Sequence, residues 1–211
     1  RIEYLPYCRN ILLHNYTRMK LKEIAEISTG YSFRTKIKHD PAGETKVIQM
    51  SDVDKYEGIL VDKLQSLSNF EPRSRRYFLE AGDVIMISKG YNIDAFVIPE
   101  GLGRVVTVNS FLVMKPNQSR VYPDYLAWFL NSRRTQYFFR QMAAGTDIPN
   151  LSIKALESLD VFLPSMDDQL MISELENLKK REVFLHQKIA EKKEQLVGEL
   201  LQRQADKLKS E

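Results

Sequence analysis

The sequence contains few of the residues from which enzymes build metal or nucleophilic sites. It has one cysteine, Cys8, and three scattered histidines, His14, His39 and His186. A single cysteine excludes an internal disulfide and a cysteine-rich zinc site, and no paired His-Glu helix motif is present. No GxxxxGK[ST] phosphate-binding motif occurs either. With no secretory pattern at its start, the chain is expected to be cytoplasmic.

Long apolar runs are also missing. Segments such as VFLP at 161–164 fall far short of the roughly 20 apolar residues that span a membrane, so we expect no membrane contact. The chain is nevertheless 43% hydrophobic over 211 residues. That composition is enough to bury the core of one domain of about 150 residues and to leave an appendage.

Charge of one sign does not dominate the chain, whose net charge is +3. From residue 165 onward there are 9 basic and 10 acidic residues, which leaves 22 basic and 18 acidic residues in the first 164. This balance excludes a general polycation and allows a local basic face on the first part of the chain.

Periodicity divides the sequence into three parts. Residues 1–18 form an N-terminal extension without an assigned role, 19–164 a globular domain, and 165–211 a long helix. In the domain we predict helices at 21–27, at 123–142 and after Ser152. Alternating β-branched and aromatic residues between Gly and Pro predict strands within 47–53, 58–61, 78–90, 95–116 and 159–163. The fold class expected is α+β.

The last segment carries a seven-residue apolar repeat. It consists of Met171, Leu178 and Leu185 with the companion positions Leu175, Ile189 and Leu196. Glu182 interrupts the repeat, and Lys192, Glu199 and Arg203 break it near the end. A helix from about 166 to 208 would extend roughly 60 Å, well beyond a domain of this size. The pattern predicts a coiled coil with a partner helix outside the domain.

Loops that mix basic and aromatic residues are the strongest functional signal. They carry the candidate DNA-binding residues Tyr31, Phe33, Arg34, Lys36 and Lys38, then Arg73, Arg75 and Arg76, and then Lys89, Tyr91 and Asn92. Arg133, Arg134 and Arg140 flank aromatic positions in a predicted helix. Arginine matches guanine edges, asparagine matches adenine, and lysine holds phosphate. Any one such cluster is often only solvated surface, but several on one mildly basic domain favour nucleic acid.

A second interpretation starts from the carboxylates Asp52, Asp54, Asp83 and Asp94. With Lys55 or Lys89 nearby they would suit a metal-dependent nuclease, because carboxylates hold Mg²⁺. Each of them, however, stands at a predicted turn or strand end, where aspartate is common for backbone reasons.

Five ordered segments resemble one known family. They are LKEIAEISTGYSF, GDVIMISKG, TVNSFLVMKP, YLAWFLNS and the run from GTDIPN to SELENL, which together cover about residues 19–206. The series resembles the specificity subunit of type I restriction-modification systems. The resemblance implies a target recognition domain over 19–164 followed by one spacer helix. By position it also implies DNA contacts in the loop at 145–150, with Thr146 and Asn150.

The resemblance further implies a non-catalytic, cofactor-free subunit that recognises double-stranded DNA for separate methyltransferase and restriction subunits. Members of the family typically pair two spacer helices in an antiparallel coiled coil, which sets the distance between two DNA half-sites. This sequence has one domain and one helix. It would therefore be a half-subunit forming a homodimer, or a fragment of a longer chain. A coiled-coil scaffold without DNA affinity stays open as a third reading.

Overall fold

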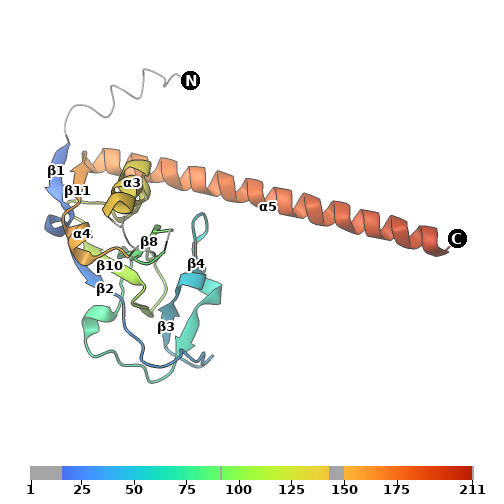
Figure 1. Ribbon diagram of the computed structural model, residues 1–211, viewed down its shortest axis with the longest axis horizontal. Helices are drawn as coiled ribbons and strands as arrows, with labels where there is room; N and C mark the ends of the chain where they lie inside the picture. The colour runs from blue at the N-terminus through green and yellow to red at the C-terminus, as the bar shows by residue number, and fades with distance from the viewer. Residues whose placement is uncertain (1–15, 91, 143–149, 211) are drawn as a thin grey trace, which may run out of the picture.

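The computed structural model describes residues 16–90, 92–142 and 150–210, in which a mixed α+β domain carries one long projecting helix (Figure 1). The elements in chain order are β1 (Thr17–Lys20), η1 (Leu21–Glu23), β2 (Ala25–Thr29), β3 (Thr45–Ile48), η2 (Met50–Asp52), β4 (Val53–Asp54), β5 (Gly58–Ile59), η3 (Val61–Lys63), β6 (Gln65–Leu67), η4 (Arg75–Tyr77), β7 (Val84–Ile87), β8 (Ala95–Val97), β9 (Arg104–Thr107), β10 (Phe111–Pro116), α2 (Pro123–Asn131), α3 (Arg133–Met142), α4 (Ile153–Glu157), β11 (Asp160–Leu163) and α5 (Met166–Ser210).

The central sheet has the strand order β2-β10-β7-β8 and is antiparallel throughout. Its middle strands are buried on both faces, because side chains alternate across a strand. Val84, Met86, Leu112 and Met114 belong to the core under the helices, while Ile85, Ile87, Phe111 and Val113 belong to a second core on the opposite face. This double burial explains why the sequence of β7 and β10 is almost continuously apolar.

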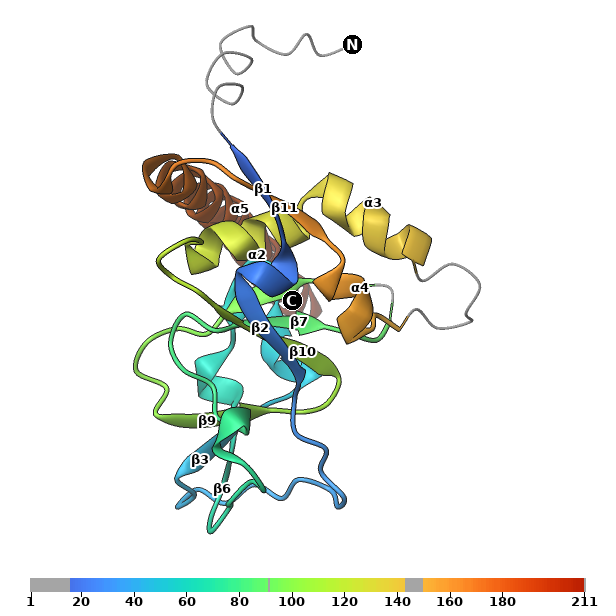
Figure 2. The same cartoon turned by 90° about the vertical axis from the view of Figure 1, so that its left-hand side faces the viewer.

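A smaller sheet, β6-β3-β9, covers the second core (Figure 2). β3 pairs parallel with β9, where Ile48 lies opposite Thr107, and antiparallel with β6. The Thr107 hydroxyl donates to the Ile48 carbonyl over 3.1 Å, which satisfies a buried polar group. Through the pairing of β3 with β6, the segment that follows β6 comes back beside the loop that precedes β3.

The predicted helix at 21–27 is wrong. Only η1 is helical, and Ala25–Thr29 forms β2, which pairs with β10 along its whole length. The spacing of Leu21, Ile24 and Ala25 does mark buried positions, but it arises from a 3-10 turn followed by a strand. Pairing with β10 overrides the helical preference of the local sequence.

The predicted helix at 123–142 is two helices. Ser132 is extended, with φ −63° and ψ 147°, and separates α2 from α3. Its hydroxyl oxygen accepts from the Thr135 amide over 3.4 Å, a contact typical of a residue that begins a helix. The short helix that follows Ser152 and the strand ending at Leu163 are confirmed.

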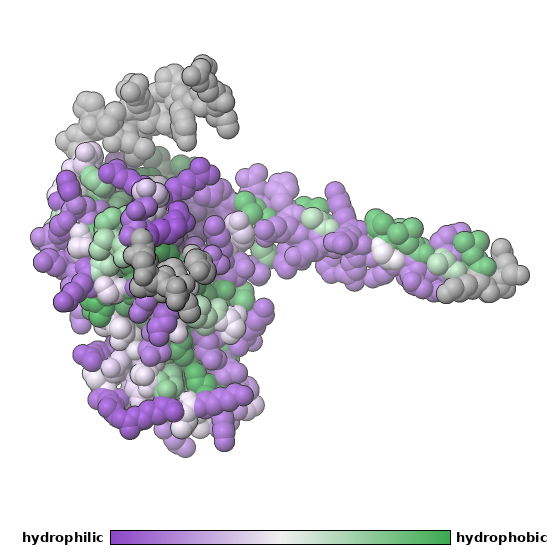
Figure 3. Space-filling model, viewed as in Figure 1, coloured by the Kyte–Doolittle hydropathy of each residue, from purple (hydrophilic) through white to green (hydrophobic). Residues whose placement is uncertain are grey.

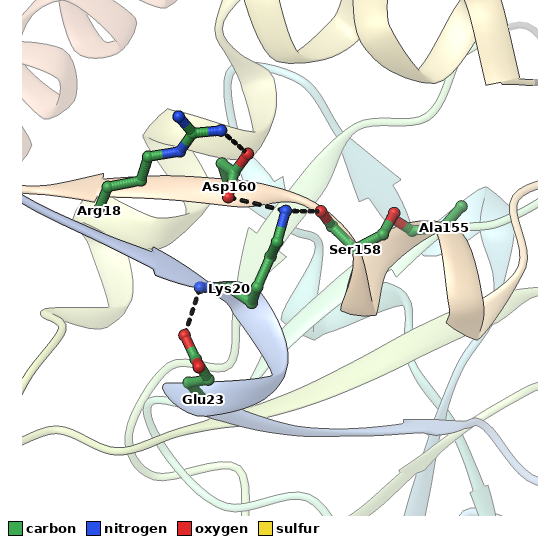
Figure 4. Close-up of polar contacts among 6 residues, drawn as sticks. All are labelled: Arg18, Lys20, Glu23, Ala155, Ser158 and Asp160. Atoms are coloured by element: carbon green, nitrogen blue, oxygen red, sulfur yellow. Dashed lines mark hydrogen bonds and ion pairs between the residues drawn. The ribbon is translucent and has the colours of Figure 1, made fainter.

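An ion-pair cluster closes the domain where its first and last strands meet (Figure 4). Asp160 on β11 pairs with Arg18 and, over 2.8 Å, with Lys20, both on β1. Lys20 also donates to the Ser158 carbonyl. The two cations hold the pKa of Asp160 at about 2, well below its ordinary 3.8. Thr17 and Arg18, expected within the extension, thus belong to the sheet of β1 and β11; residues 1–15 lie outside the described part.

Acidification is expected to release β1 from β11. Because the folded pKa of Asp160 lies below the unfolded value, its stabilising contribution is fully present above pH 3.8 and is lost as the pH falls toward about 2. Amide hydrogen exchange of Thr17–Lys20, followed from pH 5 to pH 2, measures the release. Asp160→Asn should show the fast exchange already at pH 5. Equal protection of β1 in Asp160→Asn and the unmodified chain would contradict the role of this carboxylate.

Helix α5 begins at Met166 and runs to Ser210, so the predicted long final helix is confirmed. Its first turns pack on the domain, chiefly against α2, with Gln169 and Ser173 buried. Farther along, Lys188 is close enough to Asp54 of hairpin β4–β5 to lower the pKa of that carboxyl. The Gln169 amide donates to the carbonyls of Arg120 and Pro164 and accepts from the Tyr122 amide, which fixes the direction in which the helix leaves. None of the described helices combines the length and apolar character needed to cross a membrane.

Candidate nucleic-acid interface

One hollow of the domain lies between the loop after β2 and the segment after β6. It has a volume of about 830 Å³. We call it the aromatic groove and define it by residues 31–38, 67–70, Arg73 and Tyr77. Two segments about thirty residues apart thus form one surface, and it contains six of the candidate residues: Tyr31, Phe33, Arg34, Lys36, Lys38 and Arg73.

Four aromatic rings form one cluster in this groove. Tyr31 makes edge contacts with Phe33, Phe70 and Tyr77 at centroid distances of 4.9, 5.1 and 5.2 Å. Phe33 also stacks on Phe70 at 5.3 Å. All four rings are half-buried. They hold the two segments together and still present apolar surface to a ligand.

The position of Tyr31 is set by the backbone. Its amide donates to the Thr107 carbonyl over 2.7 Å, and the Gly30 amide donates to Phe111 over 3.0 Å. A side chain at Gly30 would meet the Val108 carbonyl oxygen at 2.2 Å, a distance that real Cβ atoms do not reach. Glycine is therefore required where the loop leaves β2 and crosses the end of β9.

We expect Gly30→Ala to displace the start of the loop and weaken DNA binding. Because the obstacle is backbone, the chain has to shift, at a cost of about 1–3 kcal/mol in the free energy of unfolding. Urea denaturation measures that cost, and titration with a duplex enriched by the chain from a random-sequence DNA pool measures the affinity. Gly198→Ala is the matched control, because nothing lies within 4 Å of its added Cβ. If Gly30→Ala behaves like Gly198→Ala, the close approach does not position the loop.

The basic side chains of the loop are available to a ligand. Arg34, Lys36 and Lys38 are exposed, and no hydrogen bond or ion pair engages their side chains within the described residues. Asp40 at the end of the loop is engaged elsewhere, since it accepts from the Ser68 hydroxyl and the Ala42 amide. Three cations beside a cluster of aromatic rings suit a nucleic acid, because its phosphates are anionic and its bases and sugars offer flat or apolar surface.

The three arginines of η4 and its approach differ in their surroundings. Arg73 lines the aromatic groove. Arg76 lies over the ring of Tyr77 at 5.1 Å and donates to its hydroxyl over 3.3 Å, so it orients a groove residue. Arg75 is exposed and does not line the groove.

A second hollow of about 650 Å³ lies between the loop after β7, hairpin β4–β5 and helix α3. We call it the basic cleft and define it by its polar lining residues Asp54, Lys55, Lys89, Asn92, Asp94, Asn131, Arg133, Gln136 and Arg140. Asn150 reaches this region too, because it forms an isolated antiparallel bridge with Lys89. The cleft therefore collects Lys89 and Asn92 from the candidate residues, and Asn150 lies beside it through this bridge. Tyr91 and Thr146 lie outside the described residues.

The wall of the basic cleft is rigid. The Asn131 side chain donates to the Ala95 carbonyl and accepts from the Ala95 amide, each over 2.8 Å. Gln136 donates to the carbonyls of Ile93 and Leu130. These bonds tie α2 and α3 to the chain around β8. By contrast, Arg134 lies over the ring of Phe162 at 5.1 Å and does not line the cleft.

Three of the four candidate nuclease aspartates have structural partners, and the fourth, Asp94, lines the basic cleft. Asp52 accepts from the Gln49 amide and the Ser51 hydroxyl, and Asp83 accepts from the Glu80 amide and faces Lys115 at 3.4 Å. Burial raises the pKa of Asp83. Asp54 accepts from the amides of Tyr56 and Glu57 in a tight turn, and these bonds lower its pKa. Across the described ranges no three metal-ligating side chains converge on one point.

The apolar repeat of α5 is solvent-exposed. Its six positions, from Met171 at 41% to Leu178 at 65%, all face water. Figure 3 shows apolar patches recurring along the otherwise polar helix. Such a stripe is unusual on a helix with no partner.

Comparison with known proteins shows the family to which this chain belongs. The family model described as the type I restriction modification DNA specificity domain matches residues 14–195. The chain belongs to this specificity-domain family. No sequence among the curated proteins matches the chain.

Solved structures of specificity subunits share the fold. The HsdS subunit from Thermoanaerobacter tengcongensis is 19% identical, with a TM-score of 0.59, and the S subunit from M. genitalium is 13% identical, with a TM-score of 0.52. A structure reported for complex assembly and conformational transition of the type I R-M system is 18% identical, with a TM-score of 0.61. The matches cover 79–83% of this chain and 39–45% of those chains, so it spans less than half their length.

Sequence reasoning missed part of the surface of this specificity domain. Phe70, Asn69 and Ser68 line the aromatic groove. Lys55, which the sequence suggested only as part of a nuclease site, lines the basic cleft. For the first three, the distinguishing feature emerges only from the structure. Among the described residues, Asn69 is the one non-glycine residue with a left-handed backbone, at φ 51°. This conformation makes a sharp turn after β6 and precedes Phe70.

Proposed function

We propose that the chain recognises a specific sequence in double-stranded DNA as part of a type I restriction-modification system, without catalysing a reaction itself. The observation that carries this proposal is the specificity-domain match over residues 14–195. It agrees with two hollows that bear exposed cations together with aromatic or amide side chains.

The two hollows have different chemistry, and we assign them different parts in recognition. The aromatic groove offers Arg34 for a guanine edge, and Lys36 and Lys38 for phosphates. The basic cleft offers Asn92 and Asn150 for adenine, with Lys89 and Arg133 for the backbone. We expect the aromatic groove and the basic cleft together to contact a longer stretch of DNA than either could contact alone.

Helix α5 supplies the dimer in this proposal. Its exposed repeat would pair with the same helix of a second copy, and the coiled coil would hold two recognition domains apart. Two domains related by a two-fold axis read two half-sites, so the target would be bipartite with a fixed gap. Separate modification subunits, and a restriction subunit where the system has one, would supply methyl transfer and cleavage.

Selection from random-sequence duplexes tests the proposal. The purified chain is sedimented with the DNA pool at low and moderate salt, and the DNA that sediments with it is sequenced. Enrichment of a two-part motif with a constant gap is the expected result. Absence of any enriched motif would contradict sequence recognition by the chain alone, and cleavage or methylation by the purified chain would contradict its non-catalytic role.

A further inference from the structure

The apolar stripe of α5 is interrupted by charges at its own spacing. Glu182, Lys192, Glu199 and Arg203 continue the alternation of three and four residues that links Met171 to Leu196. The Glu182 side chain is 72% exposed. If two copies of α5 pair along this stripe, each of these charges has to lie opposite a residue of the other helix.

Parallel pairing in register would place every one of the four charges opposite its own copy. Glu182 and Glu199 would each face a carboxylate, and Lys192 and Arg203 would each face a cation. Like charges held together in a seam are strongly unfavourable, because desolvation removes the screening by water. The sequence of α5 therefore disfavours a parallel pair of these helices.

Antiparallel pairing offers a register without this conflict. In an antiparallel pair, a residue of the set Leu175, Glu182, Ile189, Leu196 and Arg203 lies opposite one of the set Met171, Leu178, Leu185, Lys192 and Glu199. Lys192 is the one cation in the second set. Placing Glu182 opposite Lys192 also sets Leu178 opposite Leu196 and Leu185 opposite Ile189 in the centre of the pair. Towards its ends, Glu199 lies opposite Leu175 and Arg203 opposite Met171, so no two like charges meet in the seam.

In the same register, each stripe position from Met171 to Arg203 of one copy faces a stripe position of the other. The two-fold axis of the pair passes beside Gln187. Leu200, which is 54% exposed, then flanks the seam near Ile172 of the second copy.

The side chains concerned are free to form this pair. Lys192 donates to the neutral Gln195 over 3.2 Å, and no carboxylate engages it within the described residues. Glu182 is 3.9 Å from His186 on the exposed surface. Lys188, which approaches its own copy at the axis, already pairs with Glu191 over 3.2 Å and lies within electrostatic reach of Asp54, so its charge is partly compensated there.

We propose that Glu182 and Lys192 form a reciprocal ion pair between two copies of this chain, which fixes the antiparallel direction and the register of the α5 coiled coil. The pair occurs twice in each dimer. The inference rests on the helix-mediated dimer proposed above and adds the residues that select its alignment.

Charge reversal tests the pair. Glu182→Lys and Lys192→Glu each place two like-charged contacts in the dimer, so sedimentation equilibrium should show dissociation constants raised on the order of tenfold or more. The double variant restores opposite charges and is expected to return within a few-fold of the unmodified chain. Glu194→Lys, an exposed position away from the stripe, is the control and should leave the dimer unchanged.

Cross-linking tests the register directly. In a Cys8→Ser background, a mixture of Met171→Cys and Arg203→Cys chains should form a disulfide, whereas Met171→Cys with Leu196→Cys should not. A dimer that ignores single charge reversals, or that cross-links only the second mixture, would overturn the inference and leave the dimer standing. A chain that stays monomeric at every concentration, or that pairs only with a different protein, would overturn the homodimer as well.

Discussion

Replacing Arg34, Lys36 and Lys38 together by alanine is expected to lower DNA affinity about a hundredfold at moderate salt. These three exposed cations border the aromatic groove and have no partner among the described residues, so each is available to a phosphate or a base edge. Each lost phosphate contact should also reduce the slope of log affinity against log salt by about 0.9. The measurement is a salt series of binding titrations with the selected DNA.

The matched control replaces three cations that line neither hollow. Lys22 on η1, Lys63 on η3 and Lys154 on α4 are exposed, and their removal changes the net charge by the same amount. This control variant should lose only the weak, long-range part of the affinity. Equal losses in the two triple variants would mean that DNA senses the overall charge of the domain and not the aromatic groove.

Phe111→Ala is expected to lower the free energy of unfolding by about 3–5 kcal/mol, the largest effect of any single change considered for this chain. Phe111 is fully buried in the core between the two sheets. Removing the ring leaves a cavity that the flanking strands cannot fill, since β10 is held by β2 on one side and β7 on the other. The backbone carbonyl of Phe111 also accepts a hydrogen bond from the Gly30 amide. Removing the ring is therefore expected to disturb the start of the loop that lines the aromatic groove.

Urea denaturation compares this variant with Tyr137→Ala. Tyr137 is also a large aromatic residue, but it is 61% exposed on α3, so its replacement should change stability by about 0.5 kcal/mol or less. DNA titration at a temperature where both variants are folded then separates stability from recognition. If the Phe111→Ala protein is as stable as the control, packing of this ring between the two sheets does not stabilise the domain.

The secondary structure was predictable from the sequence in segments where the pattern of apolar residues alone determines it. The continuous apolar character of β7 and β10 indicated buried strands, and the repeat of α5 indicated a long helix, because each pattern depends on the segment alone. The errors at 21–27 and at Ser132 have a different origin. In β2 the pairing with β10 outweighs a helix-favouring sequence, and at Ser132 one extended residue divides an otherwise regular apolar period.

The candidate site was predictable in its residue types but not in its assembly. The mixture of basic and aromatic residues at 31–38 identified one wall of the aromatic groove. The other wall, with Phe70 and Asn69, comes from the turn after β6 and meets the first because β6 pairs with β3. Likewise, Lys89 and Arg133 stand more than forty residues apart and share the basic cleft through the folding of α3 against the chain around β8.

If α5 separates two recognition domains as proposed, its uninterrupted helix also limits how the spacing of a bipartite target could change. Inserting seven residues lengthens such a helix by about 10 Å and turns the domain at its end by only about 20°. The same 10 Å corresponds to about three base pairs, over which the DNA grooves turn through roughly a third of a revolution. A heptad insertion would therefore preserve the seam but present the domain to the wrong side of the duplex. In this architecture the gap between half-sites should change only by lengths for which the insertion in α5 and the added base pairs rotate the domain and the DNA groove by the same angle.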